Sequence, residues 1–334
     1  MDPELPTPLS IDCFLEVERI ATRLLEIVAG DLRRRGIVVA LSGGVDSSVC
    51  AALACKAFGP ARVLALLLPE RESSSQSTEL GRRVAGQLGI PSILQDITPV
   101  LEALGCYSIR DQAIRSVFPE YGDDWKNKVV IRGGLEGRVH FFRLVVQAPD
   151  GRVLEHRLPH REYLQIVAAQ NFKQRVRKTV EYFHADRLNY AVLGTPNRLE
   201  YDQGFFVKNG DGSADVKPIA HLYKTQVYAL ARHLGLPEEI FTATPTTDTY
   251  SLPQGQDEFY FALPYDKMDL ALWAYDNHLP LHEIASFLTI TEEQAAVVYN
   301  DIQSKRKAAR YLHASPLLVE DLADLSSIPS GSVR

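Results

Sequence analysis

The chain has few cysteines, and their spacing excludes two kinds of site. Its 334 residues contain four: Cys13, Cys50, Cys55 and Cys106. No two of them form a C-x-x-C pair, so neither a zinc ribbon nor a dithiol redox site is indicated. Cys50 and Cys55 fall in an apolar helical stretch typical of a core. With no secretory signal, this usage predicts a reducing compartment, the cytoplasm.

Long apolar runs and an excess of basic charge are also missing. No segment approaches the roughly 20 apolar residues that span a bilayer. The formal net charge is -6, which argues against a duplex nucleic-acid binder while leaving room for a local basic pocket. Hydrophobic residues make up 46% and charged residues 23% of the chain, as in an ordinary globular protein with a core of useful size.

Short apolar, β-branched runs alternate with helical patterns along much of the chain. Runs such as Ile37–Leu41 are apolar throughout, as expected for strands buried on both faces. The alternation predicts an α/β fold, a doubly wound parallel sheet. The expected strands are 37–41, 63–68, 92–97 and 190–194, and the expected helices are 11–34, 49–58, 77–88, 162–184 and 224–234.

The alternation is interrupted between about residues 105 and 165. Two strand-like runs, 139–146 and 153–158, flank Pro149-Asp150-Gly151, which has good turn chemistry, so an inserted β-hairpin is predicted. Residues 266–312 have a helical pattern throughout. We therefore expect one domain over 1–315, with the insertion and a helical C-terminal region, and a tail over 316–334.

A glycine-rich loop follows the first expected strand and opens a helix. It comprises Ser42, Gly43, Gly44, Val45, Asp46, Ser47 and Ser48. Backbone N–H groups at a helix N-terminus bind phosphate, and glycines let the backbone approach the anion. A Mg²⁺ ion between Asp46 and phosphate oxygens would relieve their repulsion. The competing interpretation is an ordinary Ser/Gly turn that caps a helix.

This loop is not a Walker A motif, because it has no G-x-x-x-x-G-K-[ST] pattern. It resembles the pyrophosphate-binding loop of the N-type ATP pyrophosphatases, which activate a substrate by adenylation and release pyrophosphate. That resemblance implies ATP as co-substrate. A sulfur-transfer member of the group is disfavoured, because the chain lacks a catalytic cysteine pair.

Later segments narrow the resemblance to the NAD synthetase family, over most of residues 15–315. They occur in the family's order at 171–177, 193–200, 204–219, 222–224 and 245–248. The most specific is the G-F-F-x-K-x-G-D-G pattern at 204–212. The family adenylates the carboxylate of nicotinic acid adenine dinucleotide, and ammonia then displaces AMP to give the amide.

The resemblance implies a role for each matching residue. Asp46 and Glu200 match the magnesium ligands. The positions that contact ATP are Ser42, Gly43, Gly44, Asp46, Ser47, Ser48, Arg175, Thr195, Lys224 and Thr246. Lys208 and Asp211 match positions on the acceptor side, and Asp211 is a candidate to orient ammonia. Asp46, Asp211 and Lys208 are the expected catalytic residues.

Departures from the family affect the acceptor side. The stretch between Ile97 and Asn171 is longer than usual, Lys178 replaces an apolar residue, and the segment 247–250 differs. Two alternatives therefore stay open: the same chemistry on another carboxylate, or a nucleotide-binding regulator without turnover. Intact Asp46, Glu200 and Lys224 argue against the regulator.

Three expectations concern partners. Residues 281–298 have a helix-turn-helix pattern, but its mildly basic surroundings favour a helical hairpin over a DNA-binding module. No glutaminase domain is apparent, so free ammonia or a separate ammonia-supplying subunit is expected. The family forms homodimers, which the resemblance implies here too.

Overall fold

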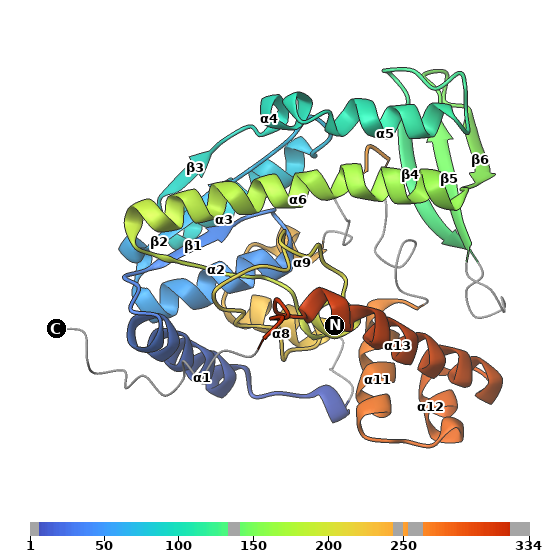
Figure 1. Ribbon diagram of the computed structural model, residues 1–334. Coiled ribbons are helices and arrows are strands. Elements are labelled where there is room, and N and C mark those ends of the chain that lie inside the picture. Colours follow the sequence, from blue (N-terminus) through green and yellow to red (C-terminus); the bar gives the residue numbers. More distant parts are fainter. Residues whose placement is uncertain (1–6, 133–140, 243–249, 253–262, 321–334) are drawn as a thin grey trace.

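A parallel sheet stands at the centre of the chain, shown in Figure 1 as a computed structural model. The structure describes residues 7–132, 141–242, 250–252 and 263–320. The sheet has the order β3-β2-β1-β7, with β1 spanning Ile37–Ala40, β2 Val63–Leu67, β3 Ser92–Leu94 and β7 Ala191–Val192. β1 pairs in parallel with both β2 and β7. The predicted α/β class and all four strands are confirmed, although the strands are shorter than predicted.

Both faces of the sheet are covered, as the apolar runs require. Along β1, Ile37 and Val39 pack into one core cluster and Val38 into another. The first cluster holds residues of α1, α2, α3 and α8, and the second holds residues of α4, α5 and α6. The sheet is therefore doubly wound. The helices are α1 Cys13–Leu25, α2 Val45–Phe58, α3 Ser75–Leu88, α4 Thr98–Ala103, α5 Cys106–Arg115, α6 His160–Leu188, α7 Arg198–Gln203, α8 Lys224–His233 and α9 Glu238–Thr242.

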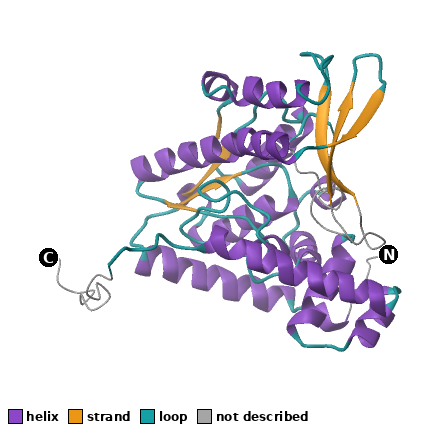
Figure 2. Cartoon of the chain, turned by 45° about the vertical axis from the view of Figure 1, so that its right-hand side comes forward, coloured by secondary structure: helices purple, strands orange, loops and turns teal. Residues whose placement is uncertain are grey.

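The inserted segment forms a second sheet beside the first (Figures 1 and 2). It is antiparallel, with β5 Phe141–Gln147 between β4 Lys126–Arg132 and β6 Val153–Arg157. The β5–β6 pair confirms the predicted hairpin, while β4 was not predicted. Val129 and Leu144 pack from this sheet onto Ile114 of α5 and Ile166 of α6. The long helix α6 thus runs from the small sheet to the parallel sheet.

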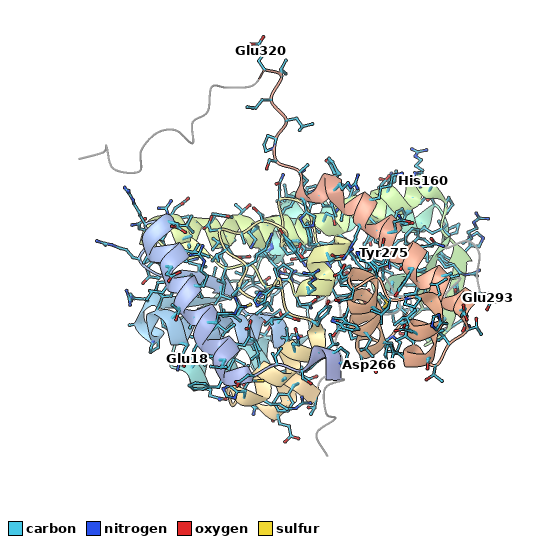
Figure 3. All side chains as sticks on the ribbon, turned by 90° about the horizontal axis from the view of Figure 1, so that it is seen from below. Glu18, His160, Asp266, Tyr275, Glu293 and Glu320 are labelled. Atoms are coloured by element: carbon cyan, nitrogen blue, oxygen red, sulfur yellow. The ribbon has the colours of Figure 1, made fainter. Side chains whose placement is uncertain are left out.

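The C-terminal region is helical, as predicted. Its helices are α11 Tyr265–Asp276, α12 Leu281–Leu288 and α13 Glu292–His313. Figure 3 views them from below, with Asp266, Tyr275 and Glu293 at the opposite end from Glu18 of α1. Arg306 of α13 bonds both carboxylate oxygens of Asp202, each at 2.6 Å, and a carboxylate oxygen of Asp276. These bonds tie the helical region to the chain around α7.

Two smaller observations complete the fold. The first predicted helix continues beyond α1 as a wider π-helical turn over Glu26–Asp31. Within the described ranges, no helix is long and apolar enough to cross a membrane.

Candidate active site

The glycine-rich loop lies where the strand order reverses. β2 and β3 extend from one side of β1, and β7 lies on the other. In an open parallel sheet, ligands bind at the carboxyl ends of strands beside such a reversal. Ser42 follows β1 at this edge, and Thr195 follows β7. The fold therefore places the loop at the expected ligand-binding crevice.

The shape of the loop depends on Gly43. Its φ is +81°, and a Cβ there would lie 2.3 Å from the carbonyl oxygen of Ser77 in α3. Gly44 caps α2, so the first N–H groups of this helix point out of the loop. Ser42 Oγ accepts from Gly44 N at 3.3 Å, and Ser47 Oγ donates to Gly44 O at 3.1 Å. Hydrogen bonds within the loop therefore fix its shape, and the positive N-terminal end of α2 lies next to it.

A buried ion pair joins the loop to α8. Lys224 Nζ donates to Asp46 Oδ2, and the side chain of Lys224 is only 2% exposed. Asn197 Nδ2 donates to the other oxygen, Oδ1, at 3.1 Å. Burial opposes the charged lysine, yet Asp46 and Glu200 raise the pKa of Lys224. The ammonium therefore stays charged beside the carboxylate.

Glu200 adds a second carboxylate at the same place. Burial, together with the negative charge of Asp46, raises the pKa of Glu200 to about 8. Its Oε2 accepts from the backbone N of Asn197 at 3.2 Å, and Asn197 Oδ1 accepts from Glu200 N at 3.1 Å. This reciprocal capping box starts α7 and fixes both side chains. Two acidic groups are thus crowded beside the loop.

The C-terminal helices support this arrangement from behind. Asp269 of α11 is fully buried, and its Oδ2 accepts from Thr225 N at 2.8 Å in the first turn of α8. Burial raises the pKa of Asp269 to about 7. Because the preceding residue is Lys224, this bond fixes the backbone that carries the ammonium.

A cavity of about 1590 Å³ opens in front of these groups. Pockets for drug-sized ligands usually measure about 300–1,000 Å³, so two nucleotide-sized molecules are within its capacity. Of the predicted site residues, those lining it are Ser42, Gly43, Gly44, Asp46, Ser47, Arg175, Thr195, Glu200, Lys208, Asp211 and Lys224. Ser48 is not among them: it is fully buried, and its Oγ donates to Gly44 O at 2.8 Å. Thr246 lies outside the described residues.

The residues predicted for the acceptor side have defined contacts. Lys208 Nζ donates to the carbonyls of Tyr311 and Ala314, at 2.7 and 3.0 Å, at the end of α13. Arg175, which was predicted to contact ATP, is exposed beside them in the cavity, and its Nε donates to Lys208 O at 3.3 Å. Asp211 Oδ1 accepts from Val207 N at 2.8 Å, and burial raises the pKa of Asp211. The 207–211 turn is therefore closed on itself at the cavity wall.

Three features of the site were not predicted. Asn197 lies in the segment 193–200 that resembles the family, and its N-x-x-E spacing to Glu200 is a capping signal. Asp269 carried no signal, because it acts across a sequence separation of 44 residues. Lys173 is buried and donates to Glu70 and Glu72, at 3.0 and 2.7 Å, holding the loop after β2 against α6.

Asp46 and Glu200 suit a divalent cation. Carboxylate and phosphate oxygens are the ligands that Mg²⁺ prefers. Burial and the negative charge of Asp46 both raise the pKa of Glu200, and a bound cation would offset both effects. Within the described ranges, no group of three or more His, Cys, Asp or Glu side chains could hold a metal ion alone. The fit is therefore to an ion shared with bound phosphates.

Comparison with protein families gives one consistent result. A family model described as NAD synthase matches residues 16–118 and 148–310. The chain is 57% identical to an NH₃-dependent NAD⁺ synthetase of Mesorhizobium japonicum over 317 residues, or 95% of this chain and 99% of that protein. An NH₃-dependent NAD⁺ synthetase of Thermotoga maritima is 35% identical over 75% of this chain and 83% of its own length.

A solved structure shares the fold. The NH₃-dependent NAD synthetase of Campylobacter jejuni, solved with a nitrate ion, aligns with a TM-score of 0.61 over 93% of this chain and all of the other. The sequences are 20% identical in that alignment, so the likeness is evidence for the fold alone.

The first prediction concerns the loop. We expect Gly43→Ala to destabilise the protein by more than the roughly 1–2 kcal/mol that a left-handed backbone costs an alanine, because the added Cβ would also meet the backbone of Ser77. Gly89→Ala is the matched control, since Gly89 also has positive φ but nothing within 4 Å. Urea unfolding measures both; equal losses of stability would contradict the clash.

The second prediction concerns the ion pair. Lys224→Met leaves Asp46 and Glu200 without their buried cation, and breaking a buried pair in this way costs about 3–5 kcal/mol. At pH 9, above the pKa of about 8 at which Glu200 ionises, adding Glu200→Gln removes one of the two repelling carboxylates, so the double variant should unfold at a higher urea concentration than Lys224→Met. A double variant less stable than Lys224→Met would show that Glu200 does not repel Asp46.

Proposed function

Because the chain belongs to the NAD synthase family, we propose that it is an ATP-dependent amide ligase that makes NAD with ammonia as the nitrogen donor. Its substrate would be nicotinic acid adenine dinucleotide. The observation that carries the proposal is the placement of the phosphate-binding loop, two carboxylates and Lys224 in one cavity large enough for two nucleotides.

The proposed reaction has two steps. An oxygen of the acceptor carboxylate attacks the α-phosphorus of ATP; the bond to the β-phosphate oxygen breaks, and pyrophosphate leaves. Ammonia then attacks the acyl carbon, the bond to AMP breaks, and a proton is lost from nitrogen. The products are the amide, AMP and pyrophosphate.

Each residue near the loop fits a part of the first step. Gly44, Val45, Asp46 and Ser47 line the cavity, and the N–H groups of the first turn of α2 would bind pyrophosphate oxygens. Asp46 and Glu200 would hold Mg²⁺, which neutralises charge on the leaving group when bound. Lys224 and Arg175 would add positive charge at the phosphates. We keep Thr195 as a contact to the nucleotide, since it lines the cavity beside β7.

Roles on the acceptor side are also proposals. Lys208 and Asp211 line the cavity near Arg175. The raised pKa of Asp211 suits a carboxyl group that takes a proton from the attacking nitrogen. Thr246 keeps its proposed place near pyrophosphate from the resemblance alone.

The dinucleotide is favoured over another carboxylate. The long stretch between Ile97 and Asn171 was the reason to consider another carboxylate substrate. It includes residues 119–147, which the family model does not match. However, the similarity to the Mesorhizobium NH₃-dependent NAD⁺ synthetase extends over 95% of this chain, which takes in most of that segment. The segment therefore gives no reason to assign a different acceptor. A regulator without turnover is disfavoured, since the ion pair and both carboxylates are assembled.

Two further proposals concern the oligomeric state and the location. We propose a homodimer, which the resemblance implies, and a cytoplasmic location, which the cysteine usage favours. Ammonia would enter free or from a separate subunit.

The third prediction tests the reaction itself. With ATP, Mg²⁺ and ammonium, pyrophosphate release should require nicotinic acid adenine dinucleotide. Asp46→Asn should abolish release, because it removes a proposed metal ligand. Release without that acceptor, or with a different carboxylate only, would contradict the proposed substrate.

The fourth prediction concerns assembly. Light scattering should give a mass about twice that of the 37.2 kDa chain. A mass equal to one chain at the concentration used for activity would rule out the proposed homodimer.

A further inference from the structure

The C-terminal half of α6 carries a second buried ion pair in the cavity wall, in addition to the pair between Lys224 and Asp46. Lys178 Nζ donates to Glu181 Oε2 at 2.7 Å, three residues along the helix. The two side chains are only 7% and 5% exposed, and both residues line the cavity. Replacing such a pair by apolar residues of similar volume is often neutral or stabilising. Stability alone therefore does not account for two charges at this place.

The pair lies on the face of α6 that meets the turn containing Asp211. A Cβ on Gly210 would lie 2.9 Å from the Cβ of Gln174, so the turn packs directly against the helix there. Lys178 and Glu181 follow Gln174 by four and seven residues, which places all three on one face of the helix. Each of the three residues lines the cavity. The pair is therefore the next part of this helix face beyond its contact with the turn.

The charges of the pair act on Asp211. Burial is the largest influence on this carboxyl group and raises its pKa, whereas the hydrogen bond from Val207 N and the charge of Lys178 lower its pKa. Burial also raises the pKa of Glu181, the charge of Lys178 lowers it, and the negative charge of Asp211 raises it. Lys178 thus favours the carboxylate form of both acids. Because Coulomb repulsion is mutual, each acid disfavours the charged form of the other.

Other charged groups of the described chain also face Asp211. The charge of Arg177 on α6 lowers the pKa of Asp211. Lys217 Nζ donates to Gly212 O at 2.7 Å, and the charge of Asp211 raises the pKa of Lys217. The charge of Asp211 raises the pKa of Glu200 as well, so these two acids repel each other. Among these groups, the charge of Lys178 has the largest effect on the pKa of Asp211.

The second step of the proposed reaction needs a proton acceptor. Ammonia carries three hydrogens and the amide keeps two, so one proton must leave the nitrogen when the bond to AMP breaks. Asp211 can take that proton only as a carboxylate, and it takes it well only if it is not too weak a base. Resting on the proposed function, we propose that Lys178 and Glu181 are positioning residues for this step: Lys178 keeps Asp211 ionised, and Glu181 keeps it basic enough to accept the proton.

Removing the charges of the pair in two different ways should move Asp211 in opposite directions. Lys178→Met with Glu181→Leu replaces the pair by apolar side chains and leaves neither charge unpaired. Asp211 then stays buried and loses a cation whose effect outweighs that of the anion lost with it, so it ionises at a higher pH. In Glu181→Gln the cation stays and the neighbouring anion is removed, so Asp211 ionises at a lower pH. Both changes break the ion pair, so a purely structural role would shift both in the same direction.

The experiment measures amide formation against pH, with saturating ATP, Mg²⁺ and nicotinic acid adenine dinucleotide and with limiting ammonium. We expect the acidic limb of kcat/KM for ammonium to move up by about one pH unit in the double variant and to move down in Glu181→Gln. Ammonium itself titrates identically in every assay, so differences between variants come from the protein. Lys178→Arg keeps the charge and should keep the wild-type profile.

A second measurement follows Asp211 without turnover. Carbon-13 NMR of labelled aspartate side chains, with Asp211→Asn to assign the signal, should show the same two shifts of opposite sign. ATP–pyrophosphate exchange without ammonium depends on the first step alone, and its pH dependence should be the same in every variant. Thermal unfolding checks the fold of each variant.

Controls separate the pair from general damage and from the proposed function. Lys305→Met breaks another largely buried pair at the cavity, with Asp301 at 2.6 Å, and should leave the acidic limb in place. An unmoved limb in the double variant, or shifts of the same sign in both variants, would overturn the role of the pair. A wild-type protein that forms no amide from the dinucleotide and ammonium would overturn the proposed function instead, while the NMR titration would still decide whether the pair acts on Asp211.

Discussion

The buried pair between Lys224 and Asp46 is the contact on which the rest of the site depends. It joins the glycine-rich loop after β1 to the first turn of α8, across 178 residues of sequence. An isolated buried charge is costly, so neither side chain is stable there without the other. Glu200 lies beside the same pair: burial and the charge of Asp46 raise its pKa, and the charge of Lys224 lowers it. The elements around the loop are arranged to satisfy these charges.

The two sheets contribute different kinds of side chain to the cavity. The parallel sheet places the phosphate-binding groups at its carboxyl edge, where the order of strands reverses. The inserted sheet covers the far end with apolar side chains. α6 connects them, with Tyr163 near one end of the cavity and Arg175 near the other. A single long helix thus sets the spacing between a polar and an apolar end.

Much of this could be predicted from local sequence. Buried strands such as Ile37–Ala40 are visible as apolar runs, and the loop is visible because glycine and a helix start are local signals. β4 was missed, because its polar start, Lys126-Asn127-Lys128, hides a short apolar core. Asp269 could not be found at all, since an isolated carboxylate in a helical pattern is normally an exposed one. Its burial against α8 is decided by tertiary packing alone.

The support of α8 by Asp269 has a consequence for how the protein matures. Asp269 accepts a hydrogen bond from the first turn of the helix that carries Lys224, and Arg306 joins the same helical region to Asp202, close to Glu200. Synthesis proceeds from the N-terminus, so the glycine-rich loop leaves the ribosome long before either residue. A nascent chain that already has the loop still lacks the contacts that hold its partners. The contacts that hold α8 and α7 beside the loop are therefore completed only after the last helical region has been made.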